Sequence, residues 1–158
     1  MKVLGLRCRV APEIEEFRRR GAQLLRADRI AGRRHLEFAV QQAERAMRRG
    51  KSICNELPME VMVRAAATRQ IGTAIERLGV RGHREVALVC EEVPEELLAR
   101  YECAPCEDVL ELSQEKVQEL MEAYGIGEEE VEAAGGCGSR AEAVQLLVLE
   151  RIALMWVE

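Results

Sequence analysis

The carboxy-terminal segment, residues 146–157, restricts the fold of this chain more than any other feature. Glu150 and Arg151 are its only charged residues. On a helix of about 100° per residue, its apolar side chains occupy opposite sides: Leu147, Leu154 and Met155 on one, and Leu149, Ala153 and Trp156 on the other. A helix that is apolar on nearly every side must be covered on most of them. This helix is also too short to cross a bilayer.

Two arrangements would cover such a helix. It could run through the centre of the core, or it could place one side on the core and the other on a partner, which could be a second copy of the chain. A helix at the end of a small domain rarely lies in the centre, so we favour the partner. The only tryptophan of the chain, Trp156, lies in this segment, and tryptophan is enriched at protein interfaces.

The remaining sequence predicts an α+β fold, with a small mixed or antiparallel sheet flanked by several helices. A length of 158 residues with 48% hydrophobic residues suits one domain over residues 1–158, and we find no repeat and no long linker. Alternation and apolar runs predict strands over residues 2–10, 22–30 and 86–90, with a short edge strand over 109–112. Apolar residues at helical spacing predict helices over 13–20, 34–49, 58–67, 71–78, 94–100, 113–124, 128–134 and 139–156.

Charge is divided unevenly along the chain. Residues 1–80 carry 17 Lys or Arg against 9 Asp or Glu, whereas residues 81–158 carry 6 against 19. A basic half can attract a polyanion, although interleaved Arg and Glu could equally well solvate helix faces. Only 3% of the residues are aromatic, so bases would not stack on a platform and any RNA contact would use phosphate charge and shape. The basic candidates for such a contact are Arg33, Arg34, Lys51, Arg64 and Arg69.

The motifs that could carry chemistry are few. Cys103-Ala-Pro-Cys106 is a CxxC that could be half of a zinc site or a thiol-redox pair, but no second close cysteine pair accompanies it. A local disulfide or idle thiols remain the simpler interpretation. The glycine-rich residues 135–139 precede a helix, as at phosphate sites, but without a P-loop Lys-Ser/Thr they are better read as a turn. With two histidines and no nucleophile–base motif, we expect neither catalysis, nor a metal, nor a cofactor.

One set of residues between 35 and 80 is distinctive as a pattern: His35-Leu-Glu-Phe-Ala39, Ala43, Ala46, Gly50-Lys51, Glu56-Leu-Pro-Met-Glu60, Arg69-Gln-Ile71, Ala74-Ile75 and Gly79-Val80. This pattern resembles the kinase-binding subunit of KEOPS, a tRNA-modification complex; this is the family of the PRPK-binding protein. The strand 86–90 and the closing helix with Arg151-Ile-Ala-Leu154 fit as well, so the likeness covers nearly the whole chain.

The resemblance implies a non-catalytic, cytoplasmic adaptor without membrane contact. It implies docking onto the complex's small atypical kinase, indirect contact with the other KEOPS subunits, and help in holding tRNA for threonylcarbamoyladenosine modification. The kinase-binding role falls on the closing helix, at Leu149, Ile152, Ala153 and Trp156. The tRNA role falls on the basic residues named above. A zinc or thiol-redox protein built on Cys103 and Cys106 is the alternative.

Overall fold

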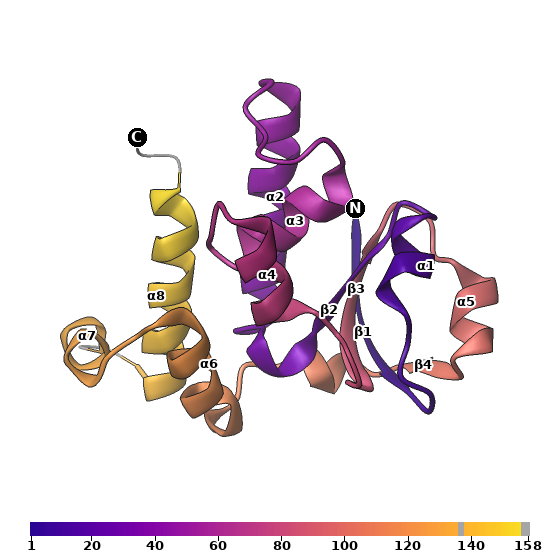
Figure 1. Ribbon diagram of the computed structural model, residues 1–158. Helices are drawn as coiled ribbons and strands as arrows, with labels where there is room; N and C mark the ends of the chain where they lie inside the picture. Colours follow the sequence, from indigo (N-terminus) through magenta and orange to yellow (C-terminus); the bar gives the residue numbers. More distant parts are fainter. Residues whose placement is uncertain (136–137, 156–158) are drawn as a thin grey trace.

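The computed structural model describes residues 1–135 and 138–155 (Figure 1). The strands are β1 (Lys2–Cys8), β2 (Gln23–Arg26), β3 (Glu85–Cys90) and β4 (Cys103–Pro105). The α-helices are α1 (Ile14–Arg18), α2 (Arg33–Arg48), α3 (Leu57–Ala65), α4 (Ile71–Leu78), α5 (Glu95–Arg100), α6 (Val117–Tyr124), α7 (Glu128–Ala134) and α8 (Arg140–Leu154). Short 3₁₀ helices cover Ala27–Arg29, Glu107–Leu110 and Gln114–Lys116.

Within the described residues the strands form one antiparallel sheet in the order β2-β3-β1-β4. The central pair, β1 and β3, runs in register from Lys2 opposite Cys90 to Arg7 opposite Glu85. Strand β3 is buried at every position after Glu85, because both faces of the sheet are covered. The expected α+β fold with an antiparallel sheet is therefore confirmed.

Each face of the sheet packs on its own helices (Figure 1). One face meets α2, α3 and α4 in a cluster that includes Leu36 and Met62. The other meets α1 and α5, with Phe17 and Leu97 in its cluster. The segment with Val109 and Leu110 also packs on the face of α2, α3 and α4.

Helices α6, α7 and α8 build a separate cluster on the side of α2 and α4 away from the sheet (Figure 1). Leu120, Val144, Val148 and Ile152 are buried in it. The cluster reaches the rest of the molecule through a few residues, among them Phe38 of α2. Helix α8 therefore lies at the periphery of the fold, as expected for a helix that is only partly covered by its own chain.

The predicted edge strand over residues 109–112 is wrong. The edge strand beside β1 is β4, and Val109 and Leu110 lie in the following 3₁₀ helix. Strand β4 ends at Pro105, which has no N–H to donate, and the Cys106 N–H makes a 2.8 Å bond to the Gly5 carbonyl. The chain then crosses directly over Gly5, where a Cβ would lie 2.5 Å from the Cys106 carbonyl oxygen.

Most other predicted elements are confirmed to within a few residues, although the strand over 22–30 is shortened to β2 by a 3₁₀ turn. Residues 136–137 of the predicted glycine-rich turn, and Trp156 of the closing helix, lie outside the described residues. Among residues 1–135 and 138–155, no helix is both long and apolar enough to span a membrane.

Candidate docking surface between helices α2 and α8

Helix α8 has one covered and one uncovered apolar side. Val144, Val148 and Ile152 point into the carboxy-terminal cluster, and Ile152 has 0% of its surface exposed. On other sides, Leu146 and Leu154 are 47% and 55% exposed. Apolar side chains are therefore found on both the buried and the exposed sides of α8.

The uncovered side forms a groove with α2. The groove has a volume of about 540 Å³. Its apolar lining comes from Phe38 of α2 and from Leu146, Leu149 and Ala153 of α8, and its polar lining from Arg34, Glu37, Gln41 and Glu150. Phe38 and Leu149 are half-buried, while Ala153 is exposed. An apolar floor with a charged rim is the arrangement found at protein–protein interfaces.

Capping and side-chain hydrogen bonds fix α8 beside α2. The hydroxyl of Ser139, at the helix start, accepts the Glu142 N–H at 3.1 Å, which is an N-cap bond. The Gln145 side-chain amide donates to the Ala31 carbonyl at 2.8 Å, just before α2 begins. Farther along, the Arg151 guanidinium donates to Glu130 of α7 at 3.0 Å. These contacts fix both the position and the rotation of α8.

His35 fixes the other wall of the groove. Its imidazole is fully buried in the first turn of α2. The Ala31 N–H donates to Nδ1 at 2.8 Å, so Nε2 carries the proton and donates to the Ala65 carbonyl at 2.9 Å. Burial lowers the pKa of His35 to about 4, and the nearby Lys116 charge acts in the same direction. His35 is thus a neutral side chain that joins α2 to the end of α3.

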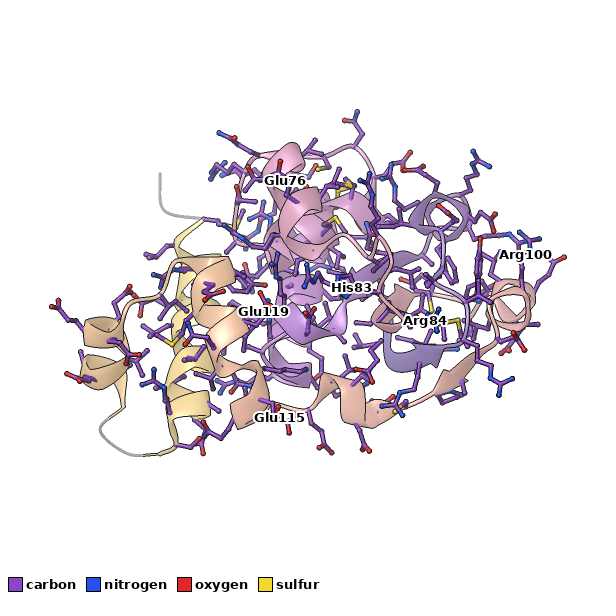
Figure 2. All side chains as sticks on the ribbon, turned by 60° about the horizontal axis from the view of Figure 1, so that its bottom comes forward. Glu76, His83, Arg84, Arg100, Glu115 and Glu119 are labelled. Atoms are coloured by element: carbon purple, nitrogen blue, oxygen red, sulfur yellow. A yellow bond between two sulfur atoms is a disulfide. The ribbon has the colours of Figure 1, made fainter. Side chains whose placement is uncertain are left out.

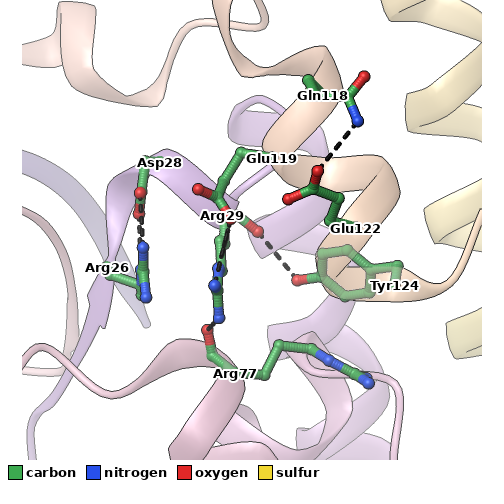
Figure 3. Close-up of polar contacts among 8 residues, drawn as sticks. All are labelled: Arg26, Asp28, Arg29, Arg77, Gln118, Glu119, Glu122 and Tyr124. Atoms are coloured by element: carbon green, nitrogen blue, oxygen red, sulfur yellow. Dashed lines mark hydrogen bonds and ion pairs between the residues drawn. The ribbon is translucent and has the colours of Figure 1, made fainter.

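A polar junction ties the carboxy-terminal helices to α4 (Figure 3). Arg29 forms an ion pair with Glu119 of α6 at 3.1 Å and donates to the Arg77 carbonyl of α4 at 2.9 Å. The Tyr124 hydroxyl lies 2.9 Å from the Arg29 carbonyl and 3.2 Å from that of Ala65. Burial raises the pKa of Tyr124, so it remains a donor. The junction holds α6 against α4 and against the turn Ala27–Arg29.

Comparison with known proteins shows to which family the chain belongs. A family model described as "Kinase binding protein CGI-121" matches residues 11–155. A curated relative, "Regulatory protein Cgi121" of Methanocaldococcus jannaschii, is 34% identical over 137 residues, which cover 84% of this chain and 81% of that protein. The chain belongs to the CGI-121 family. The resemblance to the kinase-binding subunit of KEOPS that the sequence indicated is therefore confirmed.

Of the residues predicted to bind a kinase, this CGI-121 family member places some in the groove and one in its core. Leu149 and Ala153 line the groove. Ile152 does not line the groove, because its side chain lies wholly inside the carboxy-terminal cluster. The expectation that Ile152 is available on the surface of α8 is therefore corrected. Trp156 lies outside the described residues. Leu146, which the sequence reasoning missed, is the most exposed of the groove's large apolar residues.

The five basic candidates do not gather in one place. Arg33 and Arg34 begin α2, whereas Lys51 follows its end, about 24 Å away at 1.5 Å per residue. Arg33 is engaged with Glu107 at 2.8 Å and with the Val3 carbonyl at 2.7 Å, and Arg69 donates to the Met155 carbonyl. Arg34 and Lys51 are exposed.

Arg64 is buried, which sequence reasoning also missed. It is 2% exposed, and its Nε donates to Glu60 at 2.8 Å. The other Glu60 oxygen accepts the N–H groups of Ile53 and Cys54 at 2.8 and 2.7 Å. The pair therefore anchors the loop before α3, and Arg64 offers no surface to a polyanion. The sequence feature that could have indicated this burial is a Glu and an Arg four residues apart in an otherwise apolar helix.

The cysteines do not pair as the CxxC motif suggested. Cys103 forms a disulfide with Cys8, its register partner on β1, with the two Cα atoms 3.9 Å apart. Cys106 packs on the opposite face of the sheet, with the α2–α4 cluster, and is a free thiol. In the described part of the chain, no three His, Cys, Asp or Glu side chains are grouped to hold a metal ion. This arrangement does not favour the zinc or thiol-redox alternative.

Proposed function

We propose that this chain is a non-catalytic adaptor of the KEOPS complex that binds the complex's small atypical kinase through the groove between α2 and α8. The observation that carries the proposal is the uneven covering of α8, whose Ile152 side is completely buried while Leu146 is 47% exposed. Contiguous exposed apolar surface with a polar rim marks interaction sites in soluble proteins. Membership of a family of kinase-binding proteins supports the same partner.

The lining of the groove specifies what the kinase should contribute. Phe38, Leu149 and Ala153 provide an apolar floor, and the small side chain of Ala153 leaves room for a large apolar group of the partner. Arg34 and Glu150 carry opposite charges on the two walls. A helix or strand end with an apolar anchor and charged flanks would complement this surface.

We further propose that the chain helps to recruit tRNA for threonylcarbamoyladenosine modification, with the chemistry carried out by partner subunits. The excess of cations in residues 1–80 supports this role. Four of the basic candidates are exposed, namely Arg33, Arg34, Lys51 and Arg69. Because Arg33 and Arg69 are engaged in the contacts described above, Arg34 and Lys51 are the better placed to reach phosphate groups. Arg64 is excluded because it is buried.

The groove is tested by placing a charge in its floor. Ala153→Glu and Leu146→Glu should each weaken kinase binding at least 30-fold in titration calorimetry, because the new carboxylate would lose its water in the complex. Both side chains are exposed in the free chain, so the thermal unfolding midpoint should change little. Ile152→Glu is unsuitable, since it would place a charge in the core.

Ile75→Glu is the matched control. Ile75 is an apolar side chain on α4, 44% exposed and outside the groove. Its substitution should leave kinase affinity unchanged. Wild-type affinity in both groove variants would refute the assignment of the groove, whatever the family relationship.

A further inference from the structure

The α2 wall of the groove continues beyond the end of α8 as a row of cations. Arg34, Phe38 and Gln41 line the groove at intervals of four and three residues. The same spacing leads next to Arg45 and Arg48, which therefore lie on the same side of the helix. The groove ends near Gln41 and Ala153, and the carboxy-terminal end of α2 projects past α8 (Figure 1).

The end of α2 holds two more cations in fixed positions. The Lys51 N–H bonds to the Ala46 carbonyl at 2.9 Å and the Gly50 N–H to the Met47 carbonyl at 3.3 Å, with Gly50 at a φ of 66°. These are the two bonds of a Schellman motif, which stops the helix and turns the chain sharply. Lys51 is consequently held close to the last turn. We call the four residues Arg45, Arg48, Arg49 and Lys51 the basic tip.

The basic tip differs from the other arginine-rich parts of the surface. All four side chains are exposed. Among the hydrogen bonds and ion pairs of the described residues, none involves their charged groups. Several exposed arginines elsewhere are compensated, as Arg7 is by Glu85 at 2.7 Å and Arg100 by Glu16 at 2.6 Å. Arg19, Arg34, Arg81 and Arg84 are also exposed without such an ion pair, but among the described residues only the basic tip places four such cations within seven residues. The helix dipole favours cations at a carboxyl end, but it does not remove the mutual repulsion of four like charges within seven residues.

We propose that the basic tip is a contact surface for the phosphate backbone of tRNA, directly beside the kinase groove. Residues three or four apart on a helix are separated by about 5–6 Å, and guanidinium groups bind phosphate oxygens in a bidentate manner. The tip includes no aromatic residue, so it would position the backbone and not read bases. This inference rests on the proposed tRNA role and adds three residues, Arg45, Arg48 and Arg49, that the sequence analysis did not single out.

The test compares two triple variants of the full chain. Arg45→Gln/Arg48→Gln/Arg49→Gln removes charge from the tip, and Arg19→Gln/Arg81→Gln/Arg84→Gln removes the same charge from exposed positions elsewhere (Arg84 is labelled in Figure 2). Binding of a fluorescent tRNA transcript is measured by anisotropy between 50 and 200 mM salt. The thermal unfolding midpoints and kinase affinities of both variants are measured as well.

The tip variant should flatten the salt dependence of tRNA binding. With a slope of about 0.7–0.9 per phosphate contact, loss of three contacts lowers the slope by about 2–3, so that the gain in affinity from 200 to 50 mM salt shrinks roughly 30-fold. The control variant should keep a slope close to that of the wild type. Kinase affinity should be unchanged in both.

Three outcomes would overturn the inference. An unchanged slope in the tip variant, with normal wild-type binding, would exclude the tip as the tRNA contact. Loss of kinase affinity with tRNA binding intact would instead assign the tip to an acidic surface of the protein partner. Absence of tRNA binding by the wild type, alone and with the kinase, would refute the proposed tRNA role itself.

Discussion

Protonation of His35 should destabilise the folded chain as the pH falls. In the folded state the imidazole is fully buried, and its Nδ1 accepts the Ala31 N–H. A proton on Nδ1 would turn this acceptor into a donor facing another donor, in a site that burial already makes unfavourable for charge. The pKa of His35 is lowered to about 4, against about 6.5 in an unfolded chain.

The direction in which the free energy of unfolding changes with pH depends on which state, folded or unfolded, binds the proton more tightly. Between pH 6.5 and 4 the unfolded chain carries a proton on residue 35 and the folded chain does not, so the free energy of unfolding increases with pH across this window. The contribution is fully present above pH 6.5 and is lost as the pH falls toward 4. Its size is about 3 kcal/mol overall, of which about 2 kcal/mol is lost between pH 7 and pH 5.

Urea unfolding at a series of pH values measures this loss. The pKa values of Asp28, Glu128 and Glu130 are lowered by their arginine and backbone partners, but these groups act mainly below pH 5. His35→Gln, although less stable at pH 7, should be less sensitive to pH between 7 and 5. His83→Gln, which alters the only other histidine, a half-exposed one, should retain the wild-type dependence.

Parallel curves for wild type and His35→Gln between pH 7 and 5 would refute the reasoning. A direct check is the proton resonance of the His35 ring, which should not titrate above pH 5 in the folded chain. A ring that titrates near pH 6.5 would show that the site is hydrated.

Two further predictions concern the covalent and ionic links of the fold. A double variant, Cys8→Ala with Cys103→Ser, should have a free energy of unfolding lower by about 2–4 kcal/mol, because the disulfide closes a loop of 95 residues. A reductant should lower the urea midpoint of the wild type but not that of the variant. Glu60→Gln and Arg64→Met should each cost about 3–5 kcal/mol, because each removes one side of a buried ion pair. The double variant should cost clearly less than the two single effects combined, and simple additivity in a double-mutant cycle would contradict the coupling.

Much of the architecture follows from local sequence. Helical spacing of Leu36, Val40 and Ala43 defines α2, Gly50 and Gly125 adopt positive φ where α2 and α6 end, and the apolar run in residues 86–90 becomes β3. These features depend on backbone conformation and on side chains within one or two turns, which the sequence specifies directly. The sequence also established that α8 has more apolar sides than a small fold covers, and it indicated the family.

Which side of each element faces the core was decided only by tertiary structure. Periodicity groups residues on one face, but elements distant in sequence determine whether that face is covered. Ile152 is buried and Leu146 exposed because α6 and α7 pack on one side of α8 only. Arg64 is buried where it meets Glu60, whose other carboxylate oxygen holds the distant loop at Ile53. Cys103 pairs with Cys8 because the antiparallel register of β1 and β4 brings together two residues that lie 95 positions apart.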